Sequence, residues 1–323
     1  MRFKRIAVLR GGPSEEYAVS METGAAVLKA LEEMKYPYKD IVITKKGEWL
    51  DEGKVKTPKN TLDAIDTVFI ALHGAYGEDG GVQKLLQDLE IPFTGSKAMP
   101  SAIAFNKTTT KDLLKDMDIK MPKHKHIKKD SVTDIESLVD SLNKELGEEL
   151  FIKPNTGGSS QGARYSPNKD SLRIALKELF EVYESLLIEE FIQGKEATVG
   201  VLNDFRDELI YSLPAIEIVP PSGEPLFSFE NKYNGKTKEI CPGRFSYKEK
   251  TELEEMARKI HSELRCDHYS RSDFILRNGD VYFLEINTLP GLTSESLMHK
   301  AAAAVGLGFN DLIEHLIEIA NRK

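Results

Sequence analysis

The first hundred residues alternate short β-rich runs with helical patterns, and this alternation constrains the fold more than any other feature of the chain. Apolar runs at 5–10, 39–44 and 66–72 predict strands, whereas 18–34 and 81–89 predict helices. The apolar residues at helical spacing in the longer helix are Met21, Ala25, Leu28 and Leu31. Strands separated by helices indicate a parallel, doubly wound sheet, so we expect an N-terminal α/β domain.

Two glycine-rich loops follow strands of this sheet, one after Leu9 and one after Leu72. Such sheets bind ligands at the carboxyl ends of their strands, which is where both loops lie. The first loop, "GGPSEE", lacks the G-x-G-x-x-G spacing, so a nicotinamide cofactor is unsupported. Glu15 or Glu16 at the start of a helix fits the helix dipole, and it could equally hold a substrate ammonium group. His73 in the second loop fits either a site residue or a structural histidine.

The rest of the chain predicts mixed α+β structure. The elements expected from residue 100 onward are helices at 101–117, 133–146, 168–184, 248–264 and 309–321, a strand at 149–154, two strands around Gln193–Gly194 and a hairpin at 269–287. The polar segment 220–246 is too long for a plain connection, which leaves a lid or disorder.

The composition is that of an ordinary globular protein, with 40% hydrophobic and 30% charged residues in a chain of 323. A net charge of −8 disfavours nucleic acid as the main partner. No apolar run approaches the ~18 residues of a membrane span, and the N-terminus enters a strand without a signal-peptide pattern. We therefore expect a cytoplasmic protein with no membrane partner. Cys241 and Cys266 match no metal-site spacing and are expected to be structural thiols.

The hairpin at 269–287 presents Arg271 and Asp273 on its first strand and Glu285 and Asn287 on its second. Side chains alternate faces along a strand, so each pair points one way. A two-residue Asn278–Gly279 turn is the usual choice for this sequence, but that register places Asp273 and Glu285 on opposite faces. We therefore predict a loop one residue longer, beginning at Arg277, which gathers the four polar side chains on one face. The residues then expected to pack on the other face are Phe274, Leu276, Tyr282, Leu284 and Ile286.

On one face, Asp273, Glu285 and Asn287 would offer three hard oxygen donors. This set suits zinc poorly and suits Mg²⁺ well, since Mg²⁺ keeps several waters and bridges substrate phosphates. Arg271 beside them would be a fixed cation for a phosphate or a developing oxyanion. The alternative is a surface hairpin whose acids are solvated or paired with Arg271.

Two lysines and a glycine-rich loop are candidates for a phosphate site. Lys153 ends a strand and precedes "NTGGSSQGA", whose backbone N–H groups and hydroxyls, such as that of Ser159, could bind phosphate, although no Walker A sequence follows. Lys107 on a predicted helix is a second candidate. Glu189 and Glu196 flank the turn of "EEFIQGKE", where adenine and ribose could bind. Each has an ordinary alternative: a flexible loop, a solvated lysine or an acidic hairpin.

Taken in order, these motifs resemble the D-alanine–D-alanine ligases of the ATP-grasp superfamily over essentially the whole chain. The stretches that carry the resemblance are "GGPSEEYAVSMETG", "HGAYGEDGGVQ", "GSKAMPSAIAFNK", "KPNTGGSSQG", "EEFIQGKEATVGVL", "RSDF" and "LEINTLPGLTSESLMHKAAAAVG". The first and last are specific, because together they go beyond generic ATP-grasp features. The resemblance implies an ATP-grasp fold with domains at 1–99, 100–187 and 188–323, ATP between two α+β lobes, and a lid at 222–246.

The resemblance also implies roles for individual residues. Those implied to bind ATP are Lys107, Lys153, Glu189, Phe191, Ile192, Glu196 and Lys232. Those implied to ligate two Mg²⁺ ions, for which Mn²⁺ can substitute, are Asp273, Glu285 and Asn287. Those implied to act on the two D-alanine molecules are Glu16, Ser159, Tyr233, Arg271, Gly291 and Ser296.

Within the last group, Glu16 rather than its neighbour would hold the ammonium of the first D-alanine. Ser296, with the Leu297 amide, would hold the carboxylate of the second. Arg271 and the Gly291 N–H would stabilise the tetrahedral oxyanion. The implied lid residues Lys232 and Tyr233 match a lid lysine and tyrosine of the family, with Tyr233 directed toward Ser159 and Glu16.

The implied activity is the ADP-forming ligation of two D-alanine molecules through an acyl phosphate, for peptidoglycan precursors, by a homodimer. Two alternatives remain at this point. One is a ligase that joins D-alanine to D-serine or D-lactate, although Tyr233 disfavours D-lactate. The other is a nucleotide-binding module without catalysis. Three positions depart from the family pattern, Asn106 for aspartate, Gly243 for alanine, and Ser270 for the alanine or glycine before Arg271. They concern packing more than chemistry.

Overall fold

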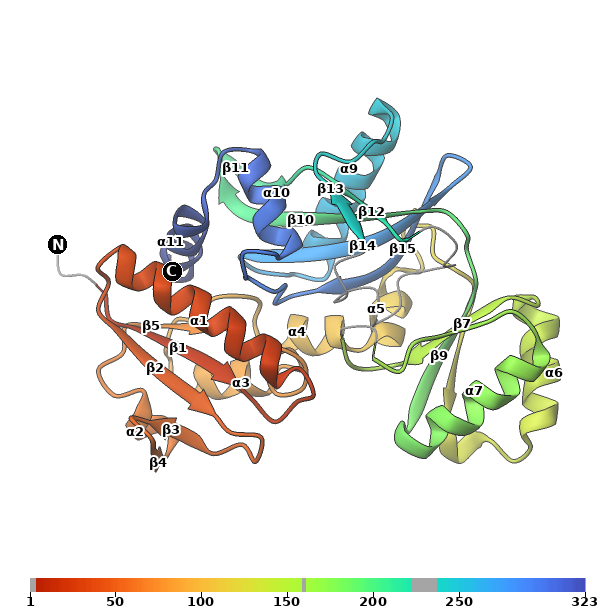
Figure 1. Cartoon of the computed structure of the whole chain (residues 1–323), viewed down its shortest axis with the longest axis horizontal. Coiled ribbons are helices and arrows are strands. Elements are labelled where there is room, and N and C mark those ends of the chain that lie inside the picture. Colours follow the sequence, from red (N-terminus) through yellow and green to blue (C-terminus); the bar gives the residue numbers. More distant parts are fainter. Residues whose placement is uncertain (1–3, 159–160, 222–236, 323) are drawn as a thin grey trace.

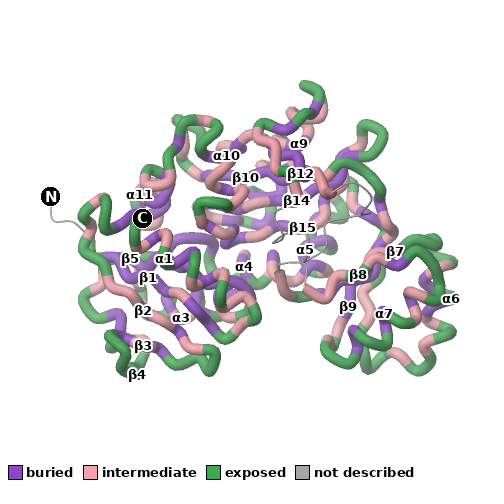
Figure 2. The backbone as a smooth tube through the Cα atoms, in the orientation of Figure 1, coloured by how far each residue is buried: buried purple, intermediate pink, exposed green. Residues whose placement is uncertain are grey.

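The protein is described by a computed structural model over residues 4–158, 161–221 and 237–322. Three sheets form its framework, and Figure 1 shows them side by side with their covering helices. In Figure 2 the buried backbone follows the strands of the N-terminal and C-terminal sheets. Within the described ranges no helix is long and apolar enough to cross a bilayer. Both cysteines are unpaired, as expected.

The N-terminal sheet has the order β4-β3-β2-β1-β5. Its elements are β1 (Ile6–Gly11), β2 (Tyr38–Ile43), β3 (Trp49–Asp51), β4 (Lys54–Lys56), β5 (Thr67–Ile70), α1 (Tyr17–Glu33), α2 (Pro58–Thr61) and α3 (Gly81–Asp88). Strand β1 lies parallel to both β2 and β5, which confirms the predicted parallel core of the sheet. The antiparallel extension by β3 and β4 was not predicted, since its strands are only three residues long.

The buried face of helix α1 agrees only in part with the one that its apolar spacing predicted: Leu31 is buried, and Met21 and Leu28 are half-buried. Its buried residues are Ser20, Thr23, Gly24, Val27, Ala30 and Leu31, whereas Ala25 is exposed. The polar residues Ser20 and Thr23 can be buried because their hydroxyl groups form hydrogen bonds with groups of the two glycine-rich loops. Ser20 Oγ accepts from Gly11 N at 2.8 Å and donates to the Ala71 carbonyl at 2.7 Å. The face is therefore chosen by hydrogen bonding to the two loops rather than by hydrophobicity alone.

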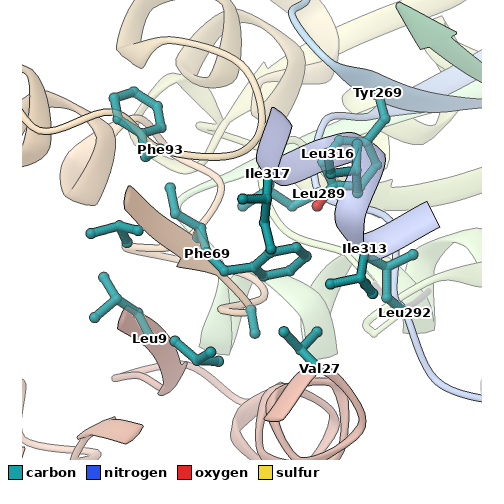
Figure 3. Close-up of a cluster of buried hydrophobic side chains, with 14 of the residues drawn as sticks. Leu9, Val27, Phe69, Phe93, Tyr269, Leu289, Leu292, Ile313, Leu316 and Ile317 are labelled. Atoms are coloured by element: carbon teal, nitrogen blue, oxygen red, sulfur yellow. The ribbon is translucent and has the colours of Figure 1, made fainter. Parts of the chain in front are cut away.

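The last helix of the chain covers this first sheet. Helix α11 (Phe309–Ala320) packs against α1 and β5. Figure 3 shows Ile313 and Ile317 of α11 beside Val27 and Phe69, all of them buried. The two ends of the sequence thus share one hydrophobic core.

The middle sheet is antiparallel, in the order β6-β9-β7-β8. Its elements are β6 (His124–Lys128), η1 (Lys129–Ser131), α6 (Ile135–Leu146), β7 (Leu150–Pro154), β8 (Arg164–Ser166), α7 (Lys169–Val182) and β9 (Ser185–Glu190). The predicted helices at 133–146 and 168–184 are confirmed as α6 and α7.

The single helix predicted at 101–117 is wrong, because two helices occupy this region. They are α4 (Ala98–Phe105) and α5 (Lys107–Leu114). Asn106 between them has φ −99° and ψ 102°, which is extended backbone. Its side chain accepts a hydrogen bond from Thr109 N at 3.0 Å and so caps α5.

The C-terminal sheet has the order β13-β12-β10-β14-β15, and β11 pairs with the last residues of β10, on the edge that faces away from β14. Its elements are β10 (Lys195–Phe205), β11 (Glu208–Ser212), β12 (Ile216–Val219), β13 (Lys238–Ile240), α9 (Tyr247–Glu263), β14 (Tyr269–Arg277), β15 (Asp280–Asn287) and α10 (Leu297–Ala304). The two strands around Gln193–Gly194 belong to different sheets, β9 to the middle one and β10 to this one. The chain therefore crosses between sheets here and does not turn a hairpin.

The turn between β14 and β15 corrects the predicted register. Arg277 pairs with Asp280, so the turn is the two-residue Asn278–Gly279, and both turn residues have positive φ (53° and 86°). The predicted three-residue loop is wrong. A β-bulge instead shifts the register between Asp273 and Phe274, and beyond it Asp273 lies opposite Glu285.

The bulge preserves the predicted grouping of polar side chains, because directly paired residues share a face. Arg271 lies opposite Asn287, two positions along from the Asp273–Glu285 pair. The packed face differs in part from the prediction. Its buried residues are Phe274, Leu276, Val281, Phe283 and Ile286, whereas Tyr282 is only half-buried and Leu284 lines the cavity described next.

Candidate active site

A cavity of about 1290 Å³ is bordered by residues from all three sheets. Every predicted site residue that the structure describes lines it. These residues are Glu16, Lys107, Lys153, Glu189, Phe191, Ile192, Glu196, Arg271, Asp273, Glu285, Asn287, Gly291 and Ser296. The remaining three, Ser159, Lys232 and Tyr233, lie outside the described residues, as does 222–236 of the expected lid.

Two lysines, one on helix α5 and one on strand β7, approach one carboxylate in this cavity. Lys107 Nζ lies 3.8 Å from Glu285 Oε2, and Lys153 Nζ lies 3.9 Å from the same atom. Lys107 also donates to the Gly157 carbonyl at 2.6 Å. Burial lowers the pKa of Lys107, whereas at Lys153 the effect of burial is outweighed by Glu189 and Glu285, which raise its pKa. The pair forms a compact cationic wall suited to phosphate.

Glu189 is buried between two lysines. Its Oε1 lies 2.8 Å from Lys111 Nζ and its Oε2 lies 2.9 Å from Lys153 Nζ. Burial alone would raise the pKa of Glu189, but Lys111 and Lys153 lower it to about 2. The carboxylate is thus a fixed anion at the cavity wall. Its predicted contact with adenine stays a prediction.

Lys111 was missed by the sequence analysis, although the sequence held a signal for it. Lys107 and Lys111 are four residues apart, and α5 therefore places them on one face. Both are buried, and the side chain of Lys111 is completely so. Two buried lysines on one helical face require anions from neighbouring elements, and Glu189 and Glu285 supply them.

Asp273 and Asn287 of the hairpin are held by hydrogen bonds at the cavity wall. Arg271 donates to both oxygens of Asp273, with Nε–Oδ1 3.0 Å and Nη2–Oδ2 3.1 Å, and Thr198 Oγ1 donates to Asp273 Oδ1 at 2.5 Å. Asn287 Oδ1 accepts from Leu289 N at 2.8 Å. The pairing of Asp273 with Arg271, one of the two options raised by the sequence, is therefore present.

The donor set of this hairpin fits a hard divalent cation. Asp273 and Glu285 face each other across the strands, and their side chains are 23% and 30% exposed, toward the cavity. Two carboxylates and an amide oxygen, without sulfur or imidazole, suit Mg²⁺ rather than zinc. The fit rests on this chemistry of the donors.

Glu16 lies where the two glycine-rich loops meet. A Cβ on Gly74, whose φ is +72°, would lie 2.8 Å from Glu16 Oε2, and a Cβ on Gly158 would lie 3.1 Å from it. Ser14 Oγ ties the loops together by donating to the His73 carbonyl at 2.7 Å. Glu15 is exposed and does not line the cavity. The glycines leave Glu16 close to backbone, at the carboxyl end of the first sheet as expected.

His73 is held by hydrogen bonds and also lines the cavity. Its Nε2 lies 2.8 Å from Thr23 Oγ1, and its Nδ1 lies 3.5 Å from Glu78 Oε1. Burial raises the pKa of Glu78, although its hydrogen bond with His73 opposes this, and the nearby Glu16 raises it further. Glu78 was not among the predicted site residues, and its only signal was its place in "HGAYGEDGG".

Helix α10 directs its N-terminus at the cavity. Ser296 is its N-cap residue, and Ser296 Oγ accepts from Thr293 N at 2.8 Å. A Cβ on Gly291 would lie 3.3 Å from that Oγ, so the loop backbone approaches it closely. The first turn of a helix has N–H groups without intrahelical partners, and together with a hydroxyl they suit a carboxylate.

Each of the three departures from the family pattern has a local physical reason. Asn106 provides the cap of α5, as described above. A Cβ on Gly243 would lie 2.3 Å from a ring atom of Phe245, so alanine does not fit there. Ser270 Oγ lies 2.7 Å from His261 Nδ1 of α9, which gives this serine a buried partner. None of these differences alters a residue of the cavity wall.

Comparison with known proteins gives matches over nearly the whole chain. The family model described as D-ala D-ala ligase N-terminus matches residues 5–63 and 51–96, and the one described as D-ala D-ala ligase C-terminus matches residues 113–318. A D-alanine–D-alanine ligase of Leptospira interrogans is 36% identical over 349 aligned positions, covering 99% of each chain.

Solved structures agree in fold. The crystal structure of a D-alanine–D-alanine ligase from Bacillus anthracis complexed with ATP has a TM-score of 0.78 and 30% identity, covering 98% of this chain and 97% of that one. The VanG D-Ala:D-Ser ligase from Enterococcus faecalis has a TM-score of 0.83 and 29% identity, covering 99% of this chain and 100% of that one.

Proposed function

Because the chain belongs to the D-alanine–D-alanine ligase family, with an ATP-grasp fold, it is an ADP-forming ligase that joins two D-alanine molecules, and we propose that it does so in the cavity between the three sheets. The observation that carries the proposal is the convergence of Lys107 and Lys153 on Glu285, which faces Asp273 across the hairpin. The proposal is supported by this proximity of two cations, which could bind phosphate, to two carboxylates, which could bind a metal ion.

ATP would bind with its phosphates against Lys107 and Lys153, and with its adenosine toward Glu189, Phe191, Ile192 and Glu196. Asp273, Glu285 and Asn287 would hold two Mg²⁺ ions, for which Mn²⁺ can substitute, and when bound these ions supply positive charge to the phosphates. The lysines fix the phosphate chain in line for transfer, since catalysis of phosphoryl transfer is mainly positioning and electrostatics.

The first D-alanine would be oriented by Glu16, which holds its ammonium group. A carboxylate oxygen of this D-alanine forms a bond to the γ-phosphorus, and the bond from that phosphorus to the ADP oxygen breaks. The result is an acyl phosphate and ADP. This activation is needed because a free carboxylate does not acylate an amine. The closeness of Glu16 to Gly74 and Gly158 supports the assignment, because it leaves the carboxylate little freedom to move.

The second D-alanine would bind with its carboxylate at Ser296 and the N-terminus of α10. Its amine nitrogen then forms a bond to the acyl carbon, and a tetrahedral oxyanion develops. Arg271 and the Gly291 N–H would stabilise this oxyanion, and loss of one such donor typically costs about 10²–10³ in rate. The bond from the acyl carbon to the phosphate oxygen breaks, phosphate leaves, and the amine loses its proton. Asp273 holds two donors of the guanidinium and thereby fixes its plane.

The reaction is tested by ADP release with Mg²⁺ and ATP in the presence of D-alanine, L-alanine, D-serine or D-lactate. We expect release with D-alanine alone, and mass spectrometry should identify D-alanyl-D-alanine. Relatives that are 35–36% identical to this chain are named D-alanine–D-alanine ligases, which disfavours a mixed ligase. Release that requires D-alanine together with D-serine or D-lactate would replace the proposal with that alternative, and no release would reject it.

Further parts of the proposal extend from the site to the whole molecule. We propose domains at 1–99, 100–187 and 188–323. The N-terminal and C-terminal sheets lie within the first and last of these ranges, whereas β9 (Ser185–Glu190) of the middle sheet extends three residues beyond 187. We also propose, from the family resemblance, a cytoplasmic homodimer that supplies peptidoglycan precursors. Sedimentation analysis of the purified protein would give the mass of a single chain if the dimer is wrong.

A further inference from the structure

Lys111 is a buried cation behind the cavity, and the reaction as derived above gives it no task. It lies on α5, its side chain is 0% exposed, and it does not line the cavity. Its Nζ lies 2.8 Å from Glu189 Oε1 and 5.9 Å from the centre of the Phe283 ring. The contact between Lys111 and Glu189 is therefore a buried ion pair.

Glu189 links this hidden lysine to a lysine that does line the cavity. Its other oxygen, Oε2, lies 2.9 Å from Lys153 Nζ. If Glu189 had Lys153 as its single cationic partner, the two charges would cancel, and Lys153 would present little net charge to a phosphate. With Lys111 on the far oxygen, the group of two lysines and one carboxylate carries a net charge of about +1 when all three are ionised.

Stability alone does not account for this arrangement. One lysine would be enough to pair with Glu189, and burying a second ammonium group costs free energy. Burial indeed lowers the pKa of Lys111, against the opposing effect of Glu189. A buried charge of this kind is usually retained where it serves the chemistry of a site.

We propose that Lys111 is a positioning residue for the phosphates of the nucleotide, because it neutralises Glu189 from behind and leaves the charge of Lys153 available to them. The inference rests on the proposed function, since it takes the cavity to be the ATP site. It predicts that the charge of Lys111, which touches neither ATP nor D-alanine, controls how strongly the phosphates bind.

The test uses the full chain and three variants, Lys111→Met, Glu189→Gln and the double variant. Isothermal titration calorimetry gives Kd for adenosine and Kd for ATP with Mg²⁺. The Kd for adenosine divided by the Kd for ATP isolates the contribution of the phosphates to binding. Any change in adenine binding cancels in this ratio. Lys111→Met should reduce the ratio by about 10–100-fold, the range of one hydrogen bond to a charged group. The double variant restores the net charge of the wild type, and its ratio should return to within about threefold of the wild-type ratio.

A wild-type ratio in Lys111→Met, or a double variant as weak as Lys111→Met, would overturn the inference. If Lys111→Met does not fold because it leaves Glu189 with an unbalanced charge, the double variant decides alone, since it removes both charges. Lys153→Met separates this inference from the function on which it rests. A Lys153→Met variant that keeps the full phosphate contribution means that the ATP site itself is wrongly placed. If Lys153→Met loses the phosphate contribution and Lys111→Met keeps it, the role of Lys111 is refuted, whereas the assignment of the ATP site stands.

Discussion

The hydrogen-bonded histidine behind the C-terminal sheet predicts a specific loss of stability in acid. His261 on α9 is fully buried, with Nδ1 2.7 Å from Ser270 Oγ and Nε2 2.9 Å from Asn203 Oδ1. In the neutral ring one nitrogen donates and the other accepts, and these two partners satisfy both. Burial, with a smaller contribution from the nearby His268, lowers the pKa of His261 to about 4.

The size of the effect follows from the two states of this histidine. Its pKa is about 4 in the folded chain and about 6.5 in the unfolded chain, so the unfolded chain takes up the proton first as the pH falls. The stabilisation is fully present above pH ~6.5 and is lost as the pH falls toward 4. In full it amounts to about 3 kcal/mol, of which about 2 kcal/mol is lost between pH 7 and pH 5. This is a large part of a typical folding free energy of about 5–15 kcal/mol.

Urea unfolding followed by circular dichroism at pH 7 and pH 5 measures this loss. Other groups also titrate in this interval, including His268, whose pKa is likewise lowered to about 4 by burial. We therefore compare the loss of unfolding free energy between pH 7 and pH 5 in the wild type with the loss in His261→Gln. The variant keeps the other titrating groups, so the difference between the two losses belongs to His261. The wild type should lose about 2 kcal/mol more than the variant. His124→Gln, in the middle sheet, is the control and should lose as much as the wild type. Equal losses in wild type and His261→Gln would refute the reasoning.

The remaining predictions concern single side chains of the site and its supports. Glu285→Gln should reduce ADP release by at least about 10²-fold while the circular dichroism spectrum stays unchanged, and retained activity would remove Glu285 from the metal site. Gly74→Ala adds a Cβ 2.8 Å from Glu16 at a φ of +72°, so steady-state kinetics should show KM for D-alanine raised about tenfold and KM for ATP unchanged. Gly243→Ala should lower the free energy of unfolding by about 1–3 kcal/mol, because its Cβ would meet Phe245, and adding Phe245→Leu should recover part of that loss in the same urea titration.

The hairpin shows how far local sequence could predict the site. The Asn278–Gly279 dipeptide favours a two-residue turn, and the polar pattern requires Asp273 and Glu285 on one face. These two demands conflict in a regular hairpin. The chain meets both with a β-bulge five residues from the turn, where Leu284 is the additional residue. A bulge has no strong local sequence signal, so the grouping of side chains was predictable and the backbone that achieves it was not.

The ion-pair partners of the buried charged side chains were harder to predict from the sequence. Glu189 and Lys153 come from neighbouring strands of one sheet, but Lys111 comes from a helix 42 or more residues earlier in the chain than either. The spacing of Lys107 and Lys111 predicts a shared helical face, and nothing local predicts that this face is buried. The buried face of α1 was also predicted incompletely, because it depends on contacts that the local sequence does not reveal. Ser20 and Thr23 are buried because they satisfy loop groups that only the fold brings near.

The connection between the middle and C-terminal sheets accounts for the cavity as a whole. A hairpin at Gln193–Gly194 would have put Glu189 and Glu196 on neighbouring strands of one sheet. The chain instead crosses from β9 to β10, so that Glu189 belongs to the middle sheet and Glu196 to the C-terminal sheet. A Cβ on Gly194 would lie 2.2 Å from the Leu276 carbonyl oxygen, so glycine lets the crossing segment pass against β14. Because β14 also carries Arg271 and Asp273, the same crossing brings the segment that bears Glu189 and Glu196 to the strand that bears these two residues. The cavity thus exists because this segment joins two sheets instead of extending one.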